Sequence, residues 1–118
     1  MWLFTPTGFL SVVADREHPG NLLVRARARA DIDAFVVATD ALAANERPDR
    51  DYRWRTSVPA ATVATYVAQQ AAAIDYGNFK NAVAERQGRD RAHRYAEVWS
   101  VMHRLQEDEV AATRRAHD

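Results

Sequence analysis

The chain begins with two short runs of strand-forming residues that are separated by a turn. The runs cover residues 2–5 and 9–13, and Pro6-Thr7-Gly8 lies between them. Proline fixes φ and glycine permits the positive φ of a short hairpin loop. We therefore predict an N-terminal β-hairpin. A second loop is predicted at residues 15–21, where Pro19-Gly20-Asn21 is a strong turn signal.

Two later segments alternate between polar and apolar residues, which is the period of a half-buried strand. They cover residues 22–30 and 52–58. In each segment the arginines are predicted to share one face, and the apolar alternates, Tyr52 and Trp54 among them, to point to the helices. One helix is predicted to start at Asp31, because a carboxylate at the N-cap accepts from free backbone N–H groups. A second helix is predicted to start at Pro59.

The last third of the chain has a helical period. A short helix is predicted over residues 79–86, stopped at Gly88, and a longer one follows. The longer helix carries a single apolar stripe, formed by Tyr95, Val98, Trp99, Met102 and Leu105. After Leu105 the stripe thins into charged residues. We expect this end of the helix to fray or to need a partner.

These elements predict an α+β fold. The expected form is a two-layer sandwich of about four mostly antiparallel strands with helices on one face, of the ferredoxin-like kind. The chain has 118 residues, which fits one domain. We assign residues 1–106 to that domain and residues 107–118 to a polar C-terminal helical extension or frayed tail.

Charge and cysteine content narrow the functional classes. Sixteen basic residues balance sixteen acidic ones, which argues against a domain devoted to coating nucleic acid and favours self-association. The chain has no cysteine, so disulfides, thiolate nucleophiles and cysteine-bound metals are excluded. The N-terminus does not resemble a signal peptide, and no apolar run approaches the length of a membrane helix. We expect a cytoplasmic location and no membrane contact.

The arginines of the two alternating segments form the first candidate site, for an anion or nucleic acid. If the two strands are neighbours, their guanidinium groups lie together on one sheet face and could pair with phosphates. Aromatic rings on that face, from Trp2, Phe4 or Phe9, would add a stacking surface for bases. The favoured alternative is that the arginines solvate an exposed face or pair with acids across the sheet. The candidate residues are Arg25, Arg27, Arg29, Arg53 and Arg55.

Residues 74–80 form the second candidate site, a partner-recognition loop. Its candidate residues are Asp75, Tyr76, Asn78 and Phe79. A loop rich in polar and aromatic residues between helices is a common place for binding residues. The structural alternative is that the aromatic residues fold back on the core while Asp75 or Asn78 caps the short helix.

Catalytic chemistry has little support in the sequence. His93 and Glu97 are four residues apart on the last helix, but a metal site needs a further ligand and no HExxH pattern exists. Residues 15–18 group an acid, a base and a histidine, His18, in what reads as a solvated turn. We predict no catalytic residue, metal or cofactor. A small hydrolase or metal-dependent enzyme is the weakest hypothesis.

Several short motifs are spread along the chain: Met1-Trp2-Leu3-Phe4-Thr5, Gly8-Phe9, Ser11-Val12-Val13, Ile74-Asp75-Tyr76, Asn78-Phe79-Lys80, Tyr95, Val98-Trp99 and Met102. With these motifs the chain resembles a group of small uncharacterised bacterial proteins of similar length. The resemblance extends from Met1 to about Gln106. It implies a self-contained bacterial domain and brings no assigned activity or ligand.

The preferred functional hypothesis is a non-catalytic binding or regulatory module. It would act through a protein partner or through a second copy of itself, as a homodimer. Binding of nucleic acid or of a phosphoanion through the arginines is the alternative.

Overall fold

The computed structural model describes residues 1–117, and the chain divides into two compact units. The first unit covers Met1–Gly77, and the second begins at Asn78. The first unit contains β1 (Trp2–Thr5), β2 (Gly8–Ala14), β3 (Asn21–Ala26), α1 (Arg29–Thr39), β4 (Asn45–Glu46), β5 (Trp54–Pro59) and α2 (Ala60–Ala72). The second unit contains α3 (Phe79–Gln87) and α4 (Arg89–His117). The boundary between the two compact units follows Gly77.

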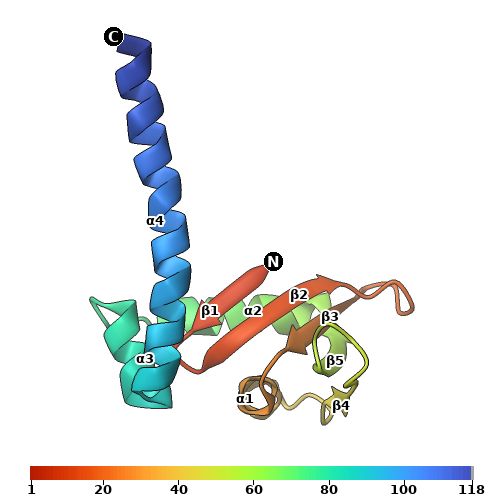
Figure 1. Cartoon of the computed structure of the whole chain (residues 1–118). Helices are drawn as coiled ribbons and strands as arrows, with labels where there is room; N and C mark the ends of the chain where they lie inside the picture. The colour runs from red at the N-terminus through yellow and green to blue at the C-terminus, as the bar shows by residue number, and fades with distance from the viewer. Residues whose placement is uncertain (118) are drawn as a thin grey trace. The chain divides into compact units, whose positions relative to one another are not determined.

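The five strands form one antiparallel sheet in the order β1-β2-β3-β5-β4 (Figure 1). The α+β class and the antiparallel sheet are confirmed, but the sheet has five strands instead of about four. The additional strand, β4, pairs Asn45 with Arg55 and Glu46 with Trp54. A strand of two exposed polar residues has no hydrophobic period, which is why the sequence reads there as a polar loop.

The N-terminal hairpin is confirmed. The Thr5 hydroxyl donates to the Gly8 carbonyl at 3.2 Å across the predicted turn. Gly8 also lies against Asp31, where a Cβ atom would come within 2.8 Å of the Asp31 Cβ and Cγ atoms. The Asp31 side chain accepts a hydrogen bond from the Phe9 N–H at 2.9 Å. The buried carboxylate therefore ties α1 to β2, and only glycine fits beside it.

Two expectations for residues 22–31 are wrong. The strand ends at Ala26 rather than at Ala30, and α1 begins at Arg29 with Ala28 as its N-cap. Alanine and arginine are both good helix formers, so the short Ala-Arg alternation also fits the start of a helix. Asp31 consequently lies in the first helical turn and does not cap the helix.

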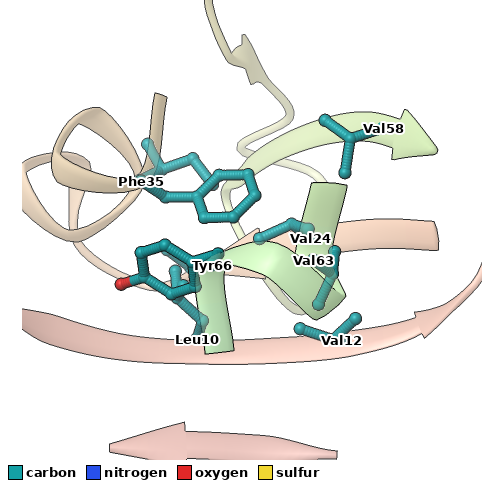
Figure 2. Close-up of a cluster of buried hydrophobic side chains, with 9 residues drawn as sticks. Leu10, Val12, Val24, Phe35, Val58, Val63 and Tyr66 are labelled. Carbon is teal, nitrogen blue, oxygen red and sulfur yellow. The ribbon is translucent and has the colours of Figure 1, made fainter. Parts of the chain in front are cut away.

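The core of the first unit lies between the sheet and the helices α1 and α2 (Figure 2). The ring of Phe35 from α1 packs edge-on against that of Tyr66 from α2, with 5.0 Å between the centroids. Burying one such side chain contributes about 1.5–3 kcal/mol. The first unit is therefore a two-layer arrangement with α1 and α2 on one face of the sheet. The buried cluster consists of Leu10, Val12, Val24, Ala26, Ile32, Phe35, Val58, Val63 and Tyr66.

The second unit is a pair of helices. The Asn78 side chain caps α3 by accepting from the Asn81 N–H at 2.9 Å, and Gly88 ends that helix with a φ of 95°. The predicted short helix and its stop are confirmed. The helices meet through small residues that include the buried Ala82, Val83 and Ala92.

The last helix, α4, continues to His117 and so includes residues 107–117 of the expected extension. Asp118 lies outside the described residues. Within residues 1–117, no helix combines the length and the apolar character that crossing a membrane requires.

Candidate functional site

The face of the sheet opposite α1 and α2 carries the first candidate site, which we call the arginine row. Strand pairing places Trp2 opposite Ser11, Ser11 opposite Arg25, and Arg25 opposite Arg55. The neighbouring positions on β2 and β3, Val12 and Val24, belong to the core. Because side chains alternate along a strand, the arginine row points away from the core. The arginine row consists of Trp2, Ser11, Arg25 and Arg55.

Aromatic rings lie on the same face as the arginine row. Phe4 and Phe9 are stacked with their centroids 4.5 Å apart, and Trp2 meets Phe9 edge-on at 5.8 Å. Phe9 in turn lies 6.5 Å from the ring of Tyr52. The hairpin aromatics, whose face the sequence left open, thus share a face with Arg25. Trp2 is the most exposed of these rings.

Tyr52 was expected to point to the helices, and this is wrong. Its buried ring contacts Arg25 and Arg27, whose guanidinium carbons lie 4.4 and 4.0 Å from the ring centroid. β5 begins only at Trp54, so Tyr52 precedes the strand and does not follow its alternation. Trp54 itself packs against the core as expected. Contacts between a cation and an aromatic ring hold the two arginines over Tyr52.

The five predicted arginines do not form one patch. Arg25, Arg27 and Arg55 lie on the arginine-row face, whereas Arg29 and Arg53 both lie 5.5 Å from the Trp54 ring. Three of the five are also paired with carboxylates: Arg27 with Asp51 at 3.2 Å, Arg29 with Asp33 at 3.5 Å, and Arg53 with Glu46. Arg29 is separated from the others because it belongs to α1.

Arg25 and Arg55 are the two predicted arginines left without a carboxylate partner among the described residues. Arg25 donates to the Ser11 hydroxyl at 2.7 Å, and its buried Nε has no hydrogen-bond partner within residues 1–117. Arg55 donates from Nε to the Tyr52 carbonyl at 3.1 Å. Burial lowers the pKa of Arg55, and the charge of Arg25 lowers it further. Like charges directly opposite each other in a sheet are destabilising. The two facing guanidinium groups therefore repel each other, and an anion bound between them would reduce this repulsion.

A hollow of about 610 Å³ adjoins Arg55 at one end of the sheet. Two of its three acidic residues are already paired: Glu46 with Arg53, and Asp15 with the Ser57 hydroxyl, from which it accepts a hydrogen bond. The hydrogen bond from Ser57 is the main reason that the pKa of Asp15 is lowered. The charged residues that line the hollow are Arg16, Arg47, Arg50, Arg55, Asp15, Glu17 and Glu46, together with His18.

Ser57, Asp15 and His18 lie together in this hollow but do not have the order of a catalytic triad. In a triad the histidine lies between the nucleophile and the acid. Here Asp15 lies in the middle, with His18 Nδ1 at 3.0 Å from its Oδ2 and Ser57 donating to the same oxygen. Ser57 therefore donates to a carboxylate of lowered pKa and not to an imidazole. Ser57 was not predicted as a member of this group, because 42 residues separate it from Asp15 and no motif links them.

The histidines of α4 lie on its surface. His93 and Glu97 are both exposed, while His103 lies 3.8 Å from Glu107, an ordinary pair four residues apart. Within residues 1–117, no three His, Cys, Asp or Glu side chains come together as a possible metal site.

Some residues of the predicted partner loop stabilise the fold. Asn78 caps α3, and Phe79 is the first residue of α3 and stacks on Tyr95 at 6.2 Å. Asp75 is exposed and Tyr76 is half-buried. The capping interpretation is thus confirmed for Asn78.

The middle of α4 carries the second candidate site, which we call the α4 face. The predicted apolar stripe is present. Tyr95 is half-buried, and the remaining side chains of the stripe are exposed, with Trp99 at 64%, Leu105 at 61% and Met102 at 56%. Exposed apolar residues at helical spacing form a ready surface for another helix. The α4 face consists of Val98, Trp99, Val101, Met102, Leu105 and Val110.

Within residues 1–117, the arginine row has cations without carboxylate partners, and the α4 face has exposed apolar side chains. Neither carries a recognisable catalytic arrangement. No family model, curated protein or solved structure matches the chain.

Proposed function

We propose that this chain is a non-catalytic binding or regulatory module that acts through protein–protein contacts made by the α4 face. The observation that carries the proposal is the exposure of six large apolar side chains along one helix. Single exposed apolar residues are normal, but a contiguous apolar patch usually marks an interaction surface.

The geometry of the second unit explains why the α4 face has no cover there. α3 has 9 residues and α4 has 29, so the shorter helix packs along only part of the longer one. Ala92 is the residue of α4 that becomes fully buried. Covering a Leu or Met side chain contributes about 1.5–3 kcal/mol. A partner on the α4 face would therefore gain substantial free energy.

A comparison of affinity-tagged variants tests this proposal. The wild-type chain, Leu105→Glu and Ser100→Glu are expressed at equal levels, and co-purifying proteins are quantified. Ser100 is exposed on the same helix outside the apolar face, so Ser100→Glu controls for added charge. We expect specific partners, the chain's own untagged copy included, to be lost with Leu105→Glu and kept with Ser100→Glu. Equal recovery with both variants contradicts the proposal.

Binding of a phosphoanion or nucleic acid is a second candidate function, and one observation favours it. Arg25 and Arg55 face each other without a carboxylate between them, next to the arginine-lined hollow. A phosphate placed there would satisfy both guanidinium groups through charge-assisted hydrogen bonds.

Fluorescence anisotropy with DNA and RNA oligonucleotides, at low and at physiological salt, tests the second candidate. We expect salt-sensitive binding that Arg55→Ala removes, because phosphate contacts release counterions. Arg114→Ala is the matched control, since it removes one exposed positive charge from α4. Absence of binding at low salt, or equal loss in both variants, eliminates this function.

Three finer expectations from the sequence remain proposals. A cytoplasmic location agrees with the cysteine-free sequence. The ferredoxin-like comparison stays a prediction, because the layers match it while the order of elements differs from the β-α-β-β-α-β unit. A small hydrolase or metal-dependent enzyme is the weakest proposal, because the exposed His93 and Glu97 form no site with a third ligand.

A further inference from the structure

The apolar stripe of α4 follows a seven-residue repeat. Tyr95, Val98, Met102 and Leu105 are separated by three, four and three residues, which is the spacing of the core positions of a coiled coil. The same repeat continues to Glu109 and Ala112. Such a face pairs with a helix that has the same repeat. The nearest source of that helix is another molecule of this chain.

We propose that the partner of the α4 face is a second copy of this chain, bound through an antiparallel pairing of the two α4 helices. This inference rests on the proposed function, since it requires the α4 face to be a binding surface. The twofold axis passes beside Ser100, so that Val98 of one copy lies opposite Met102 of the other. In the next layer Leu105 lies opposite Tyr95, which is half-buried because its ring stacks on Phe79 of α3.

Charge decides between the antiparallel and the parallel arrangement. In a parallel, in-register pair, identical core positions meet, so the two Glu109 carboxylates would lie against each other. The antiparallel pair instead places the two Glu109 carboxylates at opposite ends of the paired helices. Like charges in contact are destabilising, whereas opposite charges contribute favourably. The acidic residue that interrupts the apolar stripe therefore selects the antiparallel direction.

Charged residues beside the core positions also favour the antiparallel arrangement. In the antiparallel pair, Arg94 of one copy lies beside Asp108 of the other, and symmetry repeats the contact. Both side chains are exposed, and neither forms an ion pair within the described part of the chain. The parallel pair would bring no opposite charges together at these two positions, because Arg94 would meet Trp99. Arg94 and Asp108 thus provide a direct test of the register.

The expected dimer is short. From Arg91 to Glu109 the paired helices span roughly 28 Å at 1.5 Å per residue. The central layers are made by Val98 and Met102, with Trp99 and Val101 beside them. The chain has no net charge to oppose association. We therefore expect a dimer whose population rises with concentration.

Sedimentation velocity over a wide concentration range is the first measurement. We expect the wild-type chain and Ser100→Glu to pass from monomer to dimer, and Met102→Glu to remain monomeric. Met102 is exposed, so its replacement does not disturb the core. Circular dichroism confirms that the variants keep their helices.

Charge reversal then tests the register. Arg94→Asp or Asp108→Arg alone should weaken the dimer roughly two- to thirtyfold, because an exposed ion pair contributes about 0.2–1 kcal/mol and each dimer contains the contact twice. The double variant should return to within about twofold of the wild type. Absence of such recovery contradicts this register.

Cysteine cross-linking tests the direction, and the natural chain has no cysteine to interfere. A mixture of Val98→Cys and Met102→Cys chains should form mixed disulfides faster than either variant forms its own. Faster cross-linking of Val98→Cys with itself indicates a parallel pair and overturns the antiparallel proposal. A wild-type chain that stays monomeric at all concentrations overturns the second copy as the partner.

In that monomeric case, the rate of maleimide labelling of Met102→Cys separates the two proposals. Fast labelling shows an open α4 face, so the self-pairing is wrong while binding of another protein stands. Slow labelling shows that the chain covers its own α4 face, which contradicts the proposed function as well.

Discussion

The two units of this chain differ in whether their clusters of apolar side chains are buried or exposed. In the first unit, Leu10, Phe35 and Tyr66 are buried between a sheet and two helices. In the second unit, Trp99, Met102 and Leu105 are exposed along α4. The side chains are chemically alike, and the difference lies in whether a second layer faces them. Burial is thus a property of the arrangement of elements and not of residue type alone.

This difference determines whether a substitution changes the free energy of unfolding or the association of the chain. A change in the first unit removes packing that holds the fold together, so it lowers the free energy of unfolding. A change on the α4 face removes nothing from a core, so it should leave folding intact and alter association instead. Matched substitutions in the two settings test the comparison.

The largest effect is expected for Phe35→Ala. Truncating a fully buried phenylalanine costs about 3–5 kcal/mol through lost transfer free energy and the cavity left behind. Val37→Ala on the same helix is the control, since Val37 is 79% exposed and should change stability by no more than about 0.7 kcal/mol. Urea unfolding followed by circular dichroism measures both. Similar losses in the two variants would show that the core is misidentified.

A loss of about 1–3 kcal/mol is expected for Gly8→Ala, because the new methyl group overlaps the buried Asp31 side chain at 2.8 Å. Gly77→Ala has nothing within 4 Å of its new Cβ and should be nearly neutral. The same urea experiment compares them. Equal stability of the two variants would mean that β2 and α1 do not approach as closely as the geometry requires.

A smaller and opposite effect is expected for Val101→Ala on the α4 face. Val101 is exposed, and alanine is the better helix former, so the monomer should gain up to about 0.7 kcal/mol. Thermal unfolding at a concentration where the chain is monomeric measures this change. A clear loss of monomer stability in Val101→Ala would show that Val101 is packed against other residues. The two units would then differ less in the burial of their apolar side chains.

The smallest effect is expected for Asp15→Asn, and it should depend on pH. The pKa of Asp15 is held below its ordinary value of 3.8, chiefly by the hydrogen bond from Ser57. A lowered pKa in the folded state stabilises the fold above the unfolded pKa, and this stabilisation is lost as pH falls through the folded value. The wild type should therefore exceed Asp15→Asn in stability at pH 5, and the two should converge well below pH 3.8. Denaturant titrations at several pH values measure the difference, and a constant difference contradicts the assignment.

Local signals in the sequence were reliable where the physical cause is local. Pro6-Thr7-Gly8 predicted the hairpin, Gly88 predicted the end of α3, and Asn78 was among the predicted caps. Alternation failed near the ends of strands. Arg29 proved to be helical and Tyr52 to lie outside β5, because the period-2 pattern of the sequence extends for a few residues beyond the ends of the strands.

In the candidate site, too, features that depend on neighbouring residues were predictable, whereas contacts between residues distant in the sequence were not. The alternation of Arg25 with apolar residues placed it away from the core, and the apolar stripe of α4 was visible without a structure. The particular residues that pair with the arginines were not predicted, since Asp51 and Ser11 are distant in the sequence from Arg27 and Arg25.

The sequence by itself determined the α+β class, the hairpin, the helix boundaries marked by glycine and asparagine, and the apolar stripe of α4, because each depends on residues within a few positions of one another. Only the tertiary structure decided that β5 lies beside β3, that Arg25 therefore faces Arg55, and that the α4 face is exposed. Strand order and burial arise from contacts between distant parts of the chain. The period of a single segment shows which side chains share a face, but not which element covers that face.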